Sequence, residues 1–259
     1  MINNSVSESN IADNNRDQNI SKYRFETIVK ENIGLQNEST RNYIRDVEII
    51  FIANVGSLLR YQVLCMNTLF KTENITIPSE FMLRRISYIF DEISISVNRE
   101  GRIVELHNLK EIRKRWIITE TELRKDNKGT AIENYFKSID KLLKNETEVI
   151  DFLSDYKMYG LYFHGYYGEY DSRGINRRKV ENPDFLEDHI IEETIEIKNL
   201  KKENDSLTEL TVTGSFLDVA EQISQYDGEL YFKNGQLKEA LIAIEYKSTQ
   251  IKYNVLWVG

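Results

Sequence analysis

Between residues 189 and 258 the chain alternates polar and apolar side chains in successive runs that turn residues separate. Residues 191–198 carry only polar side chains at even positions and mostly isoleucine at odd ones. Successive side chains of a strand point to opposite faces, so this pattern predicts a strand with one buried and one solvated face. Asn234-Gly235 is typical of a two-residue hairpin. The block therefore predicts an antiparallel meander, with further strands at 207–214, 228–233, 237–246 and 251–258.

A second β-rich block precedes it, in residues 23–106. Three long runs are rich in β-branched and aromatic residues. At 49–52 the side chains of both strand faces are apolar, which predicts a strand covered on both sides. A helix at 80–91, after Pro78-Ser79, is expected to supply the cover. The predicted strands are 23–33, 44–54 and 60–71, followed by a short hairpin of 93–97 and 103–106.

The middle block, residues 108–163, has the helical period of 3.6. Three segments each begin with a capping-box pattern and continue with an apolar stripe. The third stripe runs through Phe152, Tyr156 and Tyr159. Three helices are therefore predicted, beginning at Asn108-x-x-Glu111, Thr130-x-x-Glu133 and Asn145-x-x-Glu148.

Together these blocks predict an α+β fold: a curved antiparallel sheet, with meander strands in the N- and C-terminal blocks, and a three-helix insertion packing on it. Residues 1–22 are polar and lack apolar periodicity, which predicts a disordered N-terminal arm before a single domain at 23–259. The alternative to a single domain is a division near 171–188, the segment around Pro183 with the composition of a linker. The element order is similar to that of bacterial lipoprotein-carrier half-barrels, which implies a carrier of an apolar ligand as one alternative function.

Composition narrows the class of protein. The chain has 34 basic and 42 acidic residues, a net charge of −8, which opposes general nucleic-acid binding. One cysteine, Cys65, a polar start and the lack of any apolar run near the ~20 residues of a membrane helix predict a cytoplasmic protein without membrane contact. Three histidines lack metal-ligand spacing and no glycine-rich phosphate loop occurs, so no metal or cofactor is predicted.

One pattern in the last block carries an enzyme-like signal. Asp227-Gly-Glu-Leu is followed, across the Asn234-Gly235 hairpin, by Ile244-Glu245-Tyr-Lys247-Ser. This arrangement resembles the PD-(D/E)xK nuclease core, in which an Asp and a Glu on adjacent strands hold Mg²⁺ and the Lys assists the attacking water. The resemblance covers residues 227–248 and implies catalytic roles for Asp227, Glu245 and Lys247 in an alternative, Mg²⁺-dependent nuclease function.

Two further features favour recognition of another protein. Residues 156–170 are rich in tyrosine, a residue enriched where proteins meet partners, and they also suit aromatic cover for the sheet. A basic cluster at 173–179 precedes residues 181–196, which hold seven acidic residues and no Lys or Arg. These blocks can pair internally, or the acidic one can receive a basic partner. The candidate binding residues are Tyr162, Tyr166, Tyr167, Tyr170, Arg173, Arg177, Arg178, Glu187, Asp188, Glu192 and Glu193.

The leading interpretation is a non-enzymatic, cytoplasmic protein-binding protein of bacterial type. An immunity-type protein that neutralises a basic toxin and an adaptor subunit of a larger assembly are its two versions.

Overall fold

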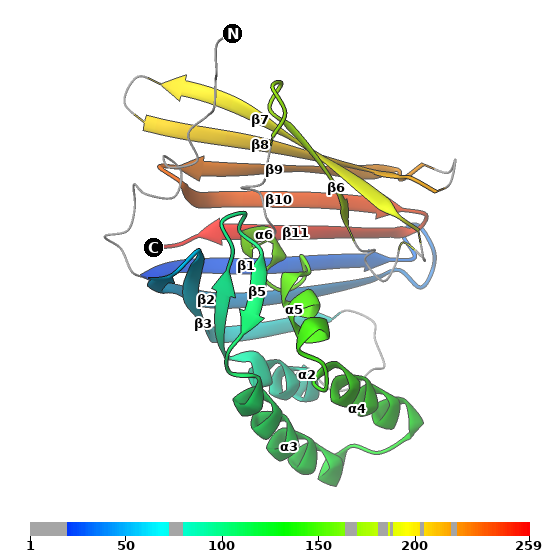
Figure 1. Cartoon of the computed structure of the whole chain (residues 1–259). Coiled ribbons are helices and arrows are strands. Elements are labelled where there is room, and N and C mark those ends of the chain that lie inside the picture. The colour runs from blue at the N-terminus through cyan, green and yellow to red at the C-terminus, as the bar shows by residue number, and fades with distance from the viewer. Residues whose placement is uncertain are drawn as a thin grey trace.

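The computed structural model describes residues 20–72, 80–163, 170–180, 186, 189–202, 205–218 and 222–259. Eleven strands form one open antiparallel sheet in the order β5-β4-β3-β2-β1-β11-β10-β9-β8-β7-β6 (Figure 1). The first and last strands of the described chain, β1 and β11, therefore lie side by side at the centre. The strands are β1 (Ile20–Glu31), β2 (Ser39–Val55), β3 (Leu58–Thr72), β4 (Glu92–Val97), β5 (Ile103–Leu106), β6 (Ile175–Val180), β7 (Ile191–Lys202), β8 (Asp205–Phe216), β9 (Gln225–Lys233), β10 (Gln236–Tyr246) and β11 (Thr249–Trp257).

The sheet has an inner face, which α5 and α6 cover, and an outer face on which no helix of the described ranges lies. Alternation along each strand assigns the side chains: Tyr23 and Phe25 of β1 and Ile242 of β10 are buried on the inner face. Their sequence neighbours on the outer face are mostly charged or polar. The predicted α+β fold with a curved antiparallel meander is thus confirmed.

The helices divide into two groups. In Figure 1, α2, α3 and α4 lie below the sheet, beyond β3, while α5 rises toward the sheet and α6 lies in front of its centre. None of the helices in the described ranges combines the length and apolar content needed to cross a membrane. Their bounds are α2 (Glu80–Ser87), the 3-10 helix η1 (Tyr88–Phe90), α3 (Leu109–Asp126), α4 (Thr130–Leu142), α5 (Glu146–Ser154) and α6 (Gly160–Phe163).

Residues 156–163 pack on the inner face instead of continuing the third predicted helix. α5 ends at Ser154 because Asp155 adopts an extended conformation and its side chain accepts a hydrogen bond from the Lys157 N–H, at 2.8 Å. The turn then brings Tyr159 against Phe25, with ring centroids 5.5 Å apart, and a fourth short helix, α6, follows. The aromatic stripe therefore covers the sheet from a turn and a short helix.

Three other predicted boundaries differ from the structure. β1 begins at Ile20, so residues 20–22, assigned to the arm, pair with β2; residues 1–19 lie outside the described chain. β7 extends to Lys202 and β8 begins at Asp205, so the connection between the strands predicted at 191–198 and 207–214 is much shorter than expected. Gly129, not Thr130, is the N-cap of α4, and the Glu133 carboxylate pairs with Arg124 of α3.

β6 is an edge strand within residues 171–188, the segment expected to separate two parts of the chain. Its residues pair along their whole length with β7 of the same sheet. Its basic run conceals the apolar alternation on which strand prediction depends. Charged side chains are common on edge strands, where they discourage pairing with other chains.

Candidate binding surface on the outer face of the sheet

The strand register gathers acidic side chains on the outer face of β7, β8, β9 and β10. Glu209 of β8 and Glu239 of β10 both lie opposite Tyr231 of β9, and Glu229 lies between Thr211 and Leu241. Residues paired directly across neighbouring strands point to the same side of a sheet, as do residues two apart on one strand, so these side chains share the outer face. We call this surface the acidic face; its carboxylates are Glu192, Glu196, Glu209, Asp227, Glu229, Glu239 and Glu245.

Tyr231 lies at the centre of three of these carboxylates. Its hydroxyl donates a hydrogen bond to Glu229 Oε2 at 2.8 Å. This hydrogen bond raises the pKa of Tyr231 to about 12, and partial burial and the charges of Glu229, Glu209 and Glu239 act in the same direction. The phenol therefore responds to a concentrated negative potential on this face.

Basic residues share the outer face with these carboxylates, because Lys198 of β7 lies opposite Glu209 and Lys179 of β6 lies opposite Glu192. None of the carboxylates of the acidic face forms a salt bridge with a residue in the described ranges, whereas on β1 and β2 Lys22 pairs with Glu48 at 3.3 Å and Arg24 with Asp46 at 2.7 Å. Leu241 and Leu256, each 43% exposed, lie beside Glu229 and Glu239. Apolar side chains among unpaired charges are typical of a surface that meets a partner.

The opposite side of β7 carries a buried ion pair. Glu193, 0% exposed, accepts hydrogen bonds from Arg178 Nε and Nη2 of β6, both 2.8 Å from its Oε2. Its Oε1 accepts from the hydroxyls of Tyr156, at 2.5 Å, and Tyr226, at 2.6 Å. Gly214 lies opposite Glu193, and a Cβ there would lie 2.4 Å from the Tyr226 ring. The glycine thus leaves the space through which Tyr226 reaches the carboxylate.

The ion pair separates Glu193 from the other carboxylates of residues 181–196, which the sequence predicted to form one docking site. Glu192 lies on the outer face, opposite Lys179, while Glu193 is buried on the inner face and cannot meet a partner. Glu187 and Asp188 lie outside the described residues. The basic cluster divides in the same way, because period 2 sends Arg177 outward and Arg178 inward.

The tyrosine-rich segment is described only in part. Tyr162 of α6 packs against Tyr23, with centroids 5.0 Å apart, and burial raises the pKa of the half-buried Tyr170 to about 12. Arg173 is exposed and pairs with Asp171 at 2.9 Å. Tyr166 and Tyr167 lie outside the described residues, so their role in binding stays a prediction.

The structure brings two of the three residues of the nuclease resemblance to one face and leaves the third outside it. Asp227 and Glu245 share the outer face, but Glu245 lies opposite Gln225 and accepts a hydrogen bond from Gln250 at 3.0 Å. Lys247 is in the turn after β10 with a positive φ of 54°, so it does not continue the strand face of Glu245. Within the described ranges, no group of three His, Cys, Asp or Glu side chains is arranged to hold a metal. The third member of the nuclease constellation is therefore displaced.

The inner face, where a carrier would hold its ligand, is packed with the chain's own side chains in the described part of the sheet. Tyr156, Leu161 and Phe163 are buried there, and the Phe163 ring lies 5.5 Å from that of Tyr61 on β3. A hollow does occur at the α2–α3 junction, lined by Phe81, Leu123 and charged side chains, far from the inner face.

Asp91, between η1 and β4, has a perturbed titration. Its Oδ1 is buried without a hydrogen-bond partner among the described residues, and burial raises its pKa to about 6, partly offset by Arg115. A folded-state pKa above the usual 3.8 means that the proton binds more tightly to the folded protein. The stability from Asp91 is therefore complete below about pH 4 and is lost as the pH rises to about 6.

Asp91→Asn should consequently stabilise the protein only where Asp91 is ionised. We expect the free energy of unfolding to rise by about 1–2 kcal/mol at pH 7, discounted for partial exposure, and to be unchanged at pH 4. Urea unfolding at the two pH values measures this difference. An equal effect at both would contradict the assignment, and Glu92→Gln at the exposed neighbouring position is the control.

Comparison with known proteins adds no family. No family model and no curated protein matches the chain. A lipovitellin structure on lipid–protein interactions is 6% identical with a TM-score of 0.47, covering 93% of this chain and 25% of that one. DynF from the dynemicin pathway of Micromonospora chersina is 6% identical with a TM-score of 0.20, covering 93% of this chain and 81% of that one. A β-barrel-like protein of unknown function from Brucella abortus is 8% identical with a TM-score of 0.26, covering 92% of this chain and 96% of that one. The chain thus spans a quarter of the lipovitellin chain, and the functional argument rests on its own residues.

Sequence reasoning missed most of the acidic face. Glu209 and Glu229 are 20 positions apart and Glu229 and Glu239 are 10 apart, so no local charge run marks them. Their common parity on three predicted strands was the available signal. The strand register, which the sequence does not specify, was needed to show that they are neighbours.

Proposed function

We propose that this chain is a protein-binding module whose acidic face receives a basic segment of a protein partner. The observation that carries the proposal is the acidic face itself: carboxylates on four adjacent strands, without salt bridges to the described residues, around two exposed leucines. Complementary charge steers a partner to such a face and fixes its orientation. The leucines supply apolar area at its border.

An immunity-type protein and an assembly adaptor both fit this proposal, because each works by covering a surface of another protein. The outer face suits that role because none of the helices in the described part of the chain covers it, whereas the inner face is occupied by α6. Binding there leaves the buried core unchanged, so we expect the partner to dock on a rigid surface.

The test is affinity capture from a native lysate with a triple variant, Glu209→Gln, Glu229→Gln and Glu239→Gln. A basic protein should be retained by the intact chain at about 50 mM salt and released at about 500 mM salt. The triple variant should retain it roughly tenfold less. Quantitative mass spectrometry of the captured proteins gives the ratio.

The matched control is Glu38→Gln, Glu80→Gln and Glu100→Gln, which changes the net charge equally at exposed sites away from the acidic face. It should capture the partner as the intact chain does. Equal loss in both triple variants would mean that net charge, not this face, governs binding, and the proposal would then fail.

A further inference from the structure

α3 presents a basic and apolar ridge to solvent. Lys110, Lys114, Ile117, Ile118 and Lys125 are spaced so that they share one side of the helix, and all five are exposed. The two isoleucines are each 61% exposed. The opposite side of α3 is buried through Leu109, Ile112, Trp116 and Leu123. We call the exposed set the basic ridge.

The lysines of the basic ridge differ from the arginines of the same helix. Arg113 donates to the carbonyls of residues 143 and 144, and Arg115 to the carbonyl of Glu92. Arg124 pairs with Glu120 and Glu133. No salt bridge joins any of the three ridge lysines to a residue that the structure describes. The arginines thus attach α3 to neighbouring elements, whereas the lysines are available to bind a partner.

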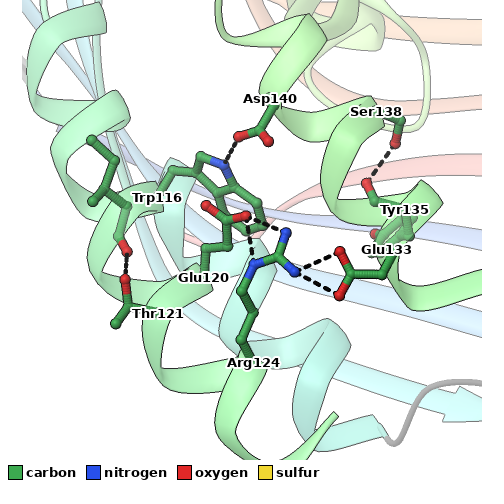
Figure 2. A network of polar contacts seen from close by, with 9 residues as sticks. Trp116, Glu120, Thr121, Arg124, Glu133, Tyr135, Ser138 and Asp140 are labelled. Carbon is green, nitrogen blue, oxygen red and sulfur yellow. Dashed lines mark hydrogen bonds and ion pairs between the residues drawn. The ribbon is translucent and has the colours of Figure 1, made fainter. Parts of the chain in front are cut away.

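Contacts on its buried side hold α3 in place. Figure 2 shows Arg124 between Glu120 of its own helix, at 2.7 Å, and Glu133 of α4, at 2.6 Å. The Trp116 indole N–H donates to Asp140 of α4 at 2.7 Å (Figure 2). The basic ridge is therefore presented on a fixed helix, which lowers the entropy cost of docking.

The basic ridge and the acidic face are complementary. Each has an apolar pair, Ile117 and Ile118 on one and Leu241 and Leu256 on the other, with unpaired charges of opposite sign around it. From Lys110 to Lys125 the helix rises about 23 Å. From Glu239 to Glu245 the strand β10 extends about 20 Å. The two surfaces thus match in charge, apolar content and length.

We propose that the basic ridge of one copy docks on the acidic face of a second copy, an inference that rests on the proposed function and names its partner. One chain cannot make this contact with itself, because α3 lies below β3 while β7–β10 are at the other end of the sheet (Figure 1). The contact joins two different surfaces, so it repeats head to tail and forms rings or short chains.

The test exchanges the charges between two variants. The first, Lys110→Glu with Lys114→Glu, reverses the basic ridge and keeps the acidic face. The second, Glu209→Lys, Asp227→Lys, Glu229→Lys and Glu239→Lys, leaves four lysines against three carboxylates, so it reverses the acidic face and keeps the ridge. Sedimentation velocity at about 0.1 mM protein and about 50 mM salt should show assemblies of the intact chain that dissociate at about 500 mM salt.

Each variant alone should be monomeric, because its ridge and face have the same sign, with self-association at least about tenfold weaker than in the intact chain. Their equimolar mixture should assemble again, since each ridge then meets a face of opposite sign. Lys137→Glu with Lys141→Glu, two exposed lysines of α4, is the control for charge and should assemble like the intact chain. Thermal unfolding of each variant checks the fold.

A monomeric intact chain at low salt, or a mixture that does not assemble, would overturn the second copy as partner. Capture of a different basic protein by the acidic face would still support the proposed function in that case. If the mixture assembles while the glutamine triple variant loses no partner from the lysate, the acidic face serves self-association alone. The failures of the two proposals are thus distinguishable.

Discussion

Glu193→Ala is expected to lower the free energy of unfolding by about 3–5 kcal/mol, the cost of removing one partner of a buried ion pair. Arg178, only 8% exposed, would retain its charge without the carboxylate that accepts its two N–H groups. The hydroxyls of Tyr156 and Tyr226 would lose the same acceptor. Urea unfolding followed by circular dichroism measures the change.

Two further variants separate the buried charge from a general effect of losing an acid. Glu192→Ala, one position earlier on the outer face, should change stability by no more than about 0.5 kcal/mol. The double variant Arg178→Met with Glu193→Leu should recover part of the loss, because it leaves no buried charge although the hydroxyls of Tyr156 and Tyr226 still lack the carboxylate. Equal effects of the Glu193 and Glu192 substitutions would show that the ion pair does not anchor β6.

Tyr159→Ala is expected to cost about 3–5 kcal/mol, as large aromatic truncations in a core do. Tyr159 is fully buried in the turn before α6 and packs against Phe25 of β1. Burial also raises the pKa of its hydroxyl above the ordinary value for tyrosine, so the ring should not ionise in alkaline solution while the protein is folded. Chemical denaturation gives the loss of stability.

Tyr231→Ala is the matched control, because Tyr231 lies half-buried on the outer face. It should cost about 1 kcal/mol, because a half-buried ring loses less contact with its surroundings than a ring in the core. If both substitutions cost the same, the first half of the tyrosine-rich segment would not be part of the core. The tyrosines of that half would then be available for binding a partner.

The strand β7 links the stability predictions to the binding proposals. Its odd positions hold the core and the ion pair through Ile191, Glu193 and Ile195, and its even positions carry Glu192 and Glu196 outward. A substitution at an odd position should therefore affect folding, and one at an even position should affect association. This separation lets the charge-exchange variants be read as tests of binding.

The sequence by itself determined the kinds of elements and most of their places. Alternation in 191–198 and the Asn234-Gly235 turn sufficed for the C-terminal meander, because a strand with one solvated face has a period of two that needs no distant partner. The helix at 80–91 was predictable for the corresponding reason, its 3.6 period.

The tertiary structure decided what the sequence left open. β6 forms because Arg178 finds Glu193 across the strand pair, and the acidic face exists because the register aligns carboxylates from strands far apart in sequence. The end of α5 and the burial of Tyr159 depend on Asp155 and on the sheet that receives the ring. These outcomes depend on contacts between distant residues, whereas periodicity reports only which side of its own element a residue occupies.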